Sequence, residues 1–349
     1  MAAYTTIDDA GLFFNPVLYT GTGTAHAITG VGFQPDFVWQ KARDTTQDHR
    51  AIDSVRGGDK QNYPDLTNAE VTDSEFITAF GADGYTMGTA GGNANDNTTK
   101  YVSWNWKAGT TSGITTDGST TITPSSYSFN QTAGISILKY TGNSTSGAGL
   151  AHGIGVKPDF LVMKKTNSAG DNWQIYHQSI GYSNSGDLAL NSTSGQGAQT
   201  NFSGEPDATN IFLGGNTINN GNTDTFICYA FADIQGYSKF SSYPGNGKAD
   251  GVFVYTGFRP AYVLIKKANS SGSWWIFDNK RLGYNAANYR LYANDGTVEN
   301  TTAELDFVSN GFKLRTTDGD LNGSGNTLIY MAWAESPLVN SEGVPTNAR

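Results

Sequence analysis

The sequence has very little cysteine and comparatively little charge, and each shortage excludes a class of protein. Cys228 is the only cysteine among 349 residues, which excludes intrachain disulfides and cysteine-ligated zinc. Charged residues make up 15%, whereas an ordinary soluble domain has about 25%. The net charge is −9 and the 22 Lys and Arg residues form no basic run, so we expect no binding to nucleic-acid phosphates.

Long apolar runs are also lacking. No stretch of about 18 apolar residues is present, so we expect no membrane insertion through a helix. The first nine residues lack the basic segment and apolar stretch of a secretory signal. We therefore expect a chain made in a cytoplasm.

Glycine and aromatic residues, by contrast, are abundant. The chain has 43 Gly, and aromatic residues make up 12%. Asn-Gly and Asp-Gly pairs, which favour tight hairpins, separate short apolar runs. No apolar stripe with helical spacing is present. The sequence therefore predicts an all-β fold with many loops and little helix.

A set of landmarks occurs three times along the chain. Each set contains a Tyr-x-Gly turn, a proline 16 to 18 residues later, a lysine six residues after the proline, and an apolar run that ends 65 to 67 residues beyond the lysine. The tyrosines are Tyr19, Tyr140 and Tyr243, the prolines Pro35, Pro158 and Pro260, the lysines Lys41, Lys164 and Lys266, and the last aromatics Trp106, Phe231 and Trp333. This order and spacing predict three homologous modules.

The landmarks give the predicted domain boundaries. We expect three β-sandwich or jelly-roll-like modules at residues 12–109, 134–236 and 237–338. Residues 1–11 form an N-terminal arm, the Ser/Thr/Gly-rich residues 110–133 a linker, and residues 339–349 a C-terminal tail. The run after each proline is apolar on both faces and predicts a central strand, whereas the closing run has large side chains on one face only.

The carboxylates give no repeated catalytic pair. Asp is frequent but mostly lies beside Gly or Asn, where turn formation explains it. No Asp or Glu recurs at one place in all three modules, so we expect no enzyme and no catalytic residues; a glycosidase pair within a single module remains the alternative.

Aromatic residues give a candidate binding surface. Trp173, Trp274 and Trp275 lie in corresponding segments, and His177 follows the first of them. If exposed, these side chains would stack on sugars or on a partner. The competing interpretation is core packing.

One loop gives a candidate metal site. Asp318, Asp320, Asn322 and Ser324 match the opening of a calcium-binding loop. The bidentate Glu expected at the twelfth position is absent, because Ile329 stands there, so a plain hairpin loop is the alternative. Apart from Ca²⁺ at this loop, we expect no cofactor.

Several segments resemble a family of structural proteins in marine tailed phages. They are residues 236–240, 254–261, 309–316 and 330–337, together with 18–21, 34–39 and 53–57 near the N-terminus. The resemblance implies a virion structural or tail-fibre-like protein with lectin-like β-sandwich modules. It carries no catalytic motif.

The function expected from the sequence is therefore that of a non-enzymatic virion structural protein. A tail fibre or appendage that binds host-surface glycan is the leading form. A capsid decoration or head-fibre protein is one alternative, and a glycan depolymerase or lectin is another. The expected location is the virion. The expected partners are copies of the chain itself, in a homotrimer, other virion proteins and host glycan.

Overall fold

The computed structural model describes residues 5–89, 94–183, 188–198, 200–281, 285 and 287–337. In this part of the chain nearly all regular structure is β-strand, and the helices are the single turns η1 (Ala10–Leu12), α1 (Thr217–Asn220) and α2 (Gly319–Asn322). The predicted all-β fold is confirmed. The described residues include no helix with the length and apolar character needed to cross a membrane.

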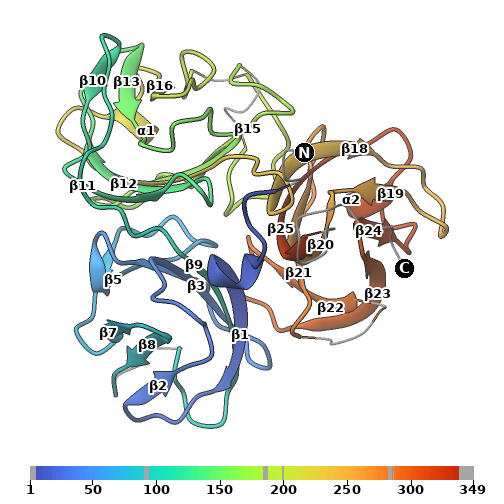
Figure 1. The fold of residues 1–349 in the computed structure, drawn as a ribbon. Coiled ribbons are helices and arrows are strands. Elements are labelled where there is room, and N and C mark those ends of the chain that lie inside the picture. Colours follow the sequence, from blue (N-terminus) through green and yellow to red (C-terminus); the bar gives the residue numbers. More distant parts are fainter. Residues whose placement is uncertain are drawn as a thin grey trace.

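The strands form three groups, here called lobes, around a common centre (Figure 1). Lobe 1 contains β1 (Phe14–Thr20), β2 (His26–Ile28), β3 (Phe37–Ala42), β4 (Arg50–Asp53), β5 (Gly57–Asn62), β6 (Val71–Thr72), β7 (Ile77–Gly81), β8 (Gly84–Met87) and β9 (Lys100–Trp106). Lobe 2 contains β10 (Thr120–Ile122), β11 (Ser126–Asn130), β12 (Ile135–Thr141), β13 (Ala148–Ala151), β14 (Phe160–Lys165), β15 (Gln174–His177), β16 (Asn210–Leu213) and β17 (Thr225–Phe231). Lobe 3 contains β18 (Ser238–Pro244), β19 (Phe253–Tyr255), β20 (Phe258–Lys267), β21 (Trp274–Asp278), β22 (Ala287–Tyr292), β23 (Asn300–Val308), β24 (Gly311–Leu314) and β25 (Thr327–Pro337).

The same antiparallel strand order lies at the heart of each lobe. It is β1-β9-β3-β4 in lobe 1, β12-β17-β14-β15 in lobe 2 and β18-β25-β20-β21 in lobe 3. In each case the closing strand lies between the Tyr-x-Gly strand and the strand that follows the proline. The strand after the proline is buried along almost its whole length, as expected for a central strand.

The closing strands differ from the expectation, because both of their faces are buried. In β9 the small face of Ser103 and Asn105 is as inaccessible as the large face of Trp104 and Trp106. The reason is a second layer of strands, which covers the small face and encloses an apolar cluster with the main sheet in lobes 1 and 2. This layer is β2-β8-β7 in lobe 1 and β10-β13-β16 in lobe 2; in lobe 3 the long sheet continues into β23-β24-β19.

Two of the predicted connecting segments belong to the folded body. Residues 110–133, expected to be a linker, supply β10 and β11, and β11 pairs along β12 with Phe129 buried. In the predicted N-terminal arm, Ile7 and Ala10 are buried in the central core, and Thr5 lies against Gly236 of lobe 3. The predicted tail, residues 339–349, lies outside the described residues.

The Tyr-x-Gly turn works as a clasp between two loops. The hydroxyls of Tyr19, Tyr140 and Tyr243 donate to the carbonyls of Ala94, Asn219 and Leu321, at 2.6 to 2.8 Å. The following glycine leaves room for the same loop: a Cβ on Gly142 would lie 2.4 Å from the Gly221 carbonyl oxygen. A larger residue would therefore force the two loops apart.

Candidate functional site

The structure buries the predicted aromatic binding surface. Trp173, Trp274, Trp275 and His177 are at most 3% exposed. They lie at the start or the end of β15 and β21, where these strands face the neighbouring lobe. The interpretation as an exposed platform is wrong. Trp173, Trp274 and His177 instead contact a neighbouring lobe, whereas Trp275 packs against Phe277 and Tyr292 within lobe 3.

We call the boundary between two neighbouring lobes a seam. At each seam a ring nitrogen of one lobe contacts a backbone carbonyl of the preceding lobe. Trp173 Nε1 donates to Tyr63 O at 2.7 Å, and Trp274 Nε1 donates to Ala189 O at 2.9 Å. At the corresponding position of lobe 1, His49 Nε2 lies 2.8 Å from Tyr292 O. Lobe 2 thus contacts lobe 1, lobe 3 contacts lobe 2, and lobe 1 contacts lobe 3, which closes a ring.

A lysine and a backbone amide add to the same seams. Lys164 Nζ donates to Thr67 O at 3.2 Å, and Lys266 Nζ donates to Thr193 O at 3.0 Å. The same two carbonyls accept the backbone N–H of residues 170 and 272, and the N–H of residue 47 donates to the Gly296 carbonyl of lobe 3. Burial lowers the pKa of Lys41, Lys164 and Lys266 to about 8. In lobes 2 and 3 the repeated lysine therefore contacts the preceding lobe, whereas Lys41 Nζ donates to Ala42 O within lobe 1.

The last residue of β4, β15 and β21 is a buried polar side chain that contacts the next lobe. Asp53 pairs with Arg56 at 2.7 Å and accepts the hydroxyl of Tyr229 from lobe 2. Asp278 pairs with Arg281 at 2.6 Å and accepts Trp104 Nε1 from lobe 1 at 3.0 Å.

Lobe 2 has His177 where the other lobes have aspartate. Its Nε2 lies 3.2 Å from Tyr330 O of lobe 3, and its Nδ1 accepts the Ser179 N–H. Burial lowers the pKa of His177 to about 4, so the ring is neutral at pH 7. Its role is therefore to hold the seam between lobes 2 and 3.

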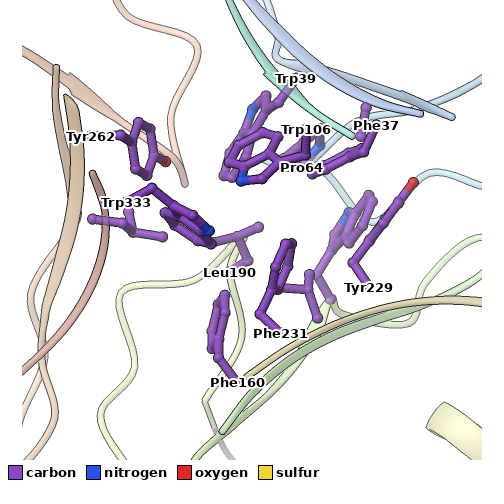
Figure 2. Close-up of a pocket in the computed structure, with 14 residues that line it drawn as sticks. Phe37, Trp39, Pro64, Trp106, Phe160, Leu190, Tyr229, Phe231, Tyr262 and Trp333 are labelled. Atoms are coloured by element: carbon purple, nitrogen blue, oxygen red, sulfur yellow. The ribbon is translucent and has the colours of Figure 1, made fainter. Parts of the chain in front are cut away.

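The three lobes meet in an aromatic core (Figure 2). The last aromatics of the closing strands, Trp106, Phe231 and Trp333, pack around the centre with ring centroids 5.2 to 6.2 Å apart. Trp333 meets the other two rings edge to face, and Trp106 and Phe231 are tilted to each other. The void they leave is about 20 Å³, on the order of the room for a single water molecule. The centre is therefore packed and offers no ligand pocket.

The predicted calcium loop is held by protein contacts. Asp318 caps α2 by accepting the Asp320 N–H at 2.8 Å, and Asp320 pairs with Lys267 at 2.7 Å. The Asn322 amide donates to the carbonyls of Lys248 and Thr316, both at 2.8 Å. Among the described residues no group of three or more His, Cys, Asp or Glu side chains is arranged to hold a metal.

The same loop has counterparts in the other lobes. Asn322 Oδ1 accepts a backbone N–H of the Tyr-x-Gly hairpin, as Asn95 and Asn220 do in lobes 1 and 2. Ser324 packs near Gly247 of that hairpin. Asn322 and Ser324 therefore belong to the clasp.

An open polar hollow lies elsewhere, where the connection from lobe 2 to lobe 3 passes β19. Its volume is about 440 Å³, and we call it the β19 hollow. It is lined by Asp233, Gln235, Gly236, Ser238, Lys239, Tyr255 and Thr256. The sequence predicts no binding role for these residues, although five of them lie in the segments 236–240 and 254–261 that carry the family resemblance. Phe253, Val254 and Tyr255 alternate along β19, which places both aromatic residues on the face opposite Val254. Val254 is buried, and Phe253 and Tyr255 are 46% and 56% exposed, so this alternation was the sequence signal for an exposed aromatic face.

Comparison with known proteins identifies the family of the chain. No curated protein and no solved structure matches the chain. A family model described as a domain of unknown function, DUF7483, matches residues 9–337. This match spans all three lobes, and the chain belongs to the DUF7483 family.

Proposed function

We propose that this chain is a non-enzymatic structural protein of a tailed-phage particle, carried on a tail fibre or appendage. The observation that carries the proposal is the ring of three lobes closed by buried polar contacts within one chain. Such a body is rigid without disulfides or metals, and it presents loops outward from a fixed scaffold. The segments that resemble marine phage structural proteins lie in lobes 1 and 3.

The buried polar residues support a structural role over a catalytic one. The Asp–Arg pairs, the seam lysines and His177 all hold one lobe against another. A general acid or base must instead reach a substrate proton. The proposed partners are other virion proteins, further copies of the chain, and glycan on the host surface, where many weak contacts gain strength from copy number.

Electron cryomicroscopy of the phage particle, with antibody labelling of this chain, tests the location. The proposal predicts density of the three-lobed ring on the tail or its tip. Density spread over the capsid would replace it with a head decoration or head-fibre role. Release of reducing ends from host polysaccharide by the purified chain would contradict the non-enzymatic assignment.

A further inference from the structure

We propose that the β19 hollow is a binding subsite for one neutral sugar unit, with Tyr255 as the surface on which the sugar ring stacks. Its volume of about 440 Å³ lies within the range of roughly 300–1,000 Å³ that is usual for small-molecule sites. This inference deepens the proposed attachment function and rests on it for its biological meaning.

The aromatic group of the hollow is exposed and held in place. Tyr255 is 56% exposed, although its strand is paired along β24 and the buried Val254 anchors the strand to the core. Phe253 lies on the same face, two residues away, and is 46% exposed. Exposed aromatic faces on a paired strand suit the C–H groups of a sugar ring, since the backbone that carries them requires no ordering on binding.

The polar groups of the hollow favour a ligand without net charge. Asp233 and Lys239 pair at 2.6 Å, so their charges cancel, and the side chains are 23% and 40% exposed. Each keeps hydrogen-bonding capacity beyond this pair: a carboxylate accepts at several lone pairs, and an ammonium has three donors. Together with the exposed amide of Gln235, they offer donors and acceptors to hydroxyl groups.

Saturation-transfer NMR on the purified full-length chain tests the site. The probes are glucose, galactose, mannose and N-acetylglucosamine, with glucuronic acid as a charged comparison. At least one neutral sugar should bind, and it should bind more tightly than glucuronic acid. Tyr255→Ala should weaken that binding about tenfold, whereas Tyr255→Phe, which keeps the ring, should lose less.

Val156→Ala is the matched control, because Val156 is a 47% exposed apolar side chain on lobe 2. It should leave binding unchanged, and thermal unfolding should show that both Tyr255 variants are folded. Binding by none of the neutral sugars, or equal binding by Tyr255→Ala, would overturn the proposal. The assay uses no particle, so its failure is distinct from a failure of the proposed location.

Discussion

Single side chains decide how the lobes are joined, and most of them are polar groups with a carbonyl partner in another lobe. Trp173, Trp274 and His49 each bring a ring nitrogen to such a carbonyl. A buried carbonyl that loses its donor costs about 1–3 kcal/mol. These contacts therefore fix which lobe faces which, in addition to contributing stability.

The clasp glycine gives the first prediction. Gly142→Ala should lower the free energy of unfolding by about 1–3 kcal/mol, because the new Cβ meets the backbone of residues 220 and 221. Urea unfolding followed by fluorescence measures this. Gly118→Ala is the control, because nothing lies within 4 Å of a Cβ there, and it should be neutral. Equal stability of the two variants would contradict the clasp.

The buried ion pair of lobe 1 that contacts Tyr229 of lobe 2 gives the second prediction. Arg56→Met should cost about 3–5 kcal/mol in unfolding free energy, since it leaves the Asp53 carboxylate buried without its cation. Lys157→Ala breaks an exposed pair with Glu205, whose partners are about 42% exposed, and should cost less than about 1 kcal/mol. A small loss from Arg56→Met would show that the seam opens to water.

The histidine at the third seam predicts a pH dependence. His177 has a folded-state pKa of about 4, below the 6.5 of an unfolded chain, so the unfolded state binds more protons between these values. Its contribution is complete above pH 6.5 and is lost as the pH falls toward 4. From pH 7 to pH 5 the loss is about 2 kcal/mol.

Urea unfolding of the parent chain and of His177→Asn at pH 7 and pH 5 measures this term by difference. The difference is needed because Asp65 and Asp159, with pKa values raised by burial to about 7 and about 6, act in the opposite direction. The variant should lose about 2 kcal/mol less than the parent over this range. An unchanged pH slope would mean that His177 is not buried as a neutral ring.

Among whole elements, β11 departs most from what the sequence predicts. It lies in residues 110–133, whose Ser- and Thr-rich composition is that of a linker, yet it pairs with β12 and buries Phe129. Composition predicted a linker for this edge strand. It could not show pairing with a neighbour, because one buried aromatic among polar residues makes no periodic pattern.

Phe129→Ala separates the two interpretations of this segment. As part of a paired strand with Phe129 buried, it should lower the free energy of unfolding by about 3 kcal/mol. Thr116→Ala, at an exposed position in the same segment, is the control. A linker would make both substitutions neutral, and thermal unfolding of the two variants decides between them.

Other elements followed from the sequence closely. The repeated spacing located the Tyr-x-Gly strands, the strands after each proline and the closing strands, because tight turns and apolar runs leave strong local signals. The candidate site was harder to predict. From the sequence alone, Trp173 and Trp274 are as compatible with an exposed binding surface as with core packing. Only the tertiary contacts show that a neighbouring lobe covers them.

At the scale of the whole molecule, the lobes share a central core. A single apolar cluster contains residues from β1, β9, β14, β17, β20 and β25. Lobes 1 and 2 each enclose a further cluster of their own. The sequence pattern shows which face of a strand is apolar, but it does not show which other strands that face packs against. Separate modules were therefore the expectation. Three interlocked seams and a common centre imply that the lobes unfold together.

Native-state hydrogen exchange tests this account most directly. The seam amides of residues 47, 170 and 272, one from each lobe, donate to carbonyls of the preceding lobe. If the ring opens only as a whole, all three amides exchange with the same free energy, equal to that of global unfolding measured in urea. Exchange of one seam at a clearly lower free energy, with the other two still protected, would contradict a closed, cooperative ring.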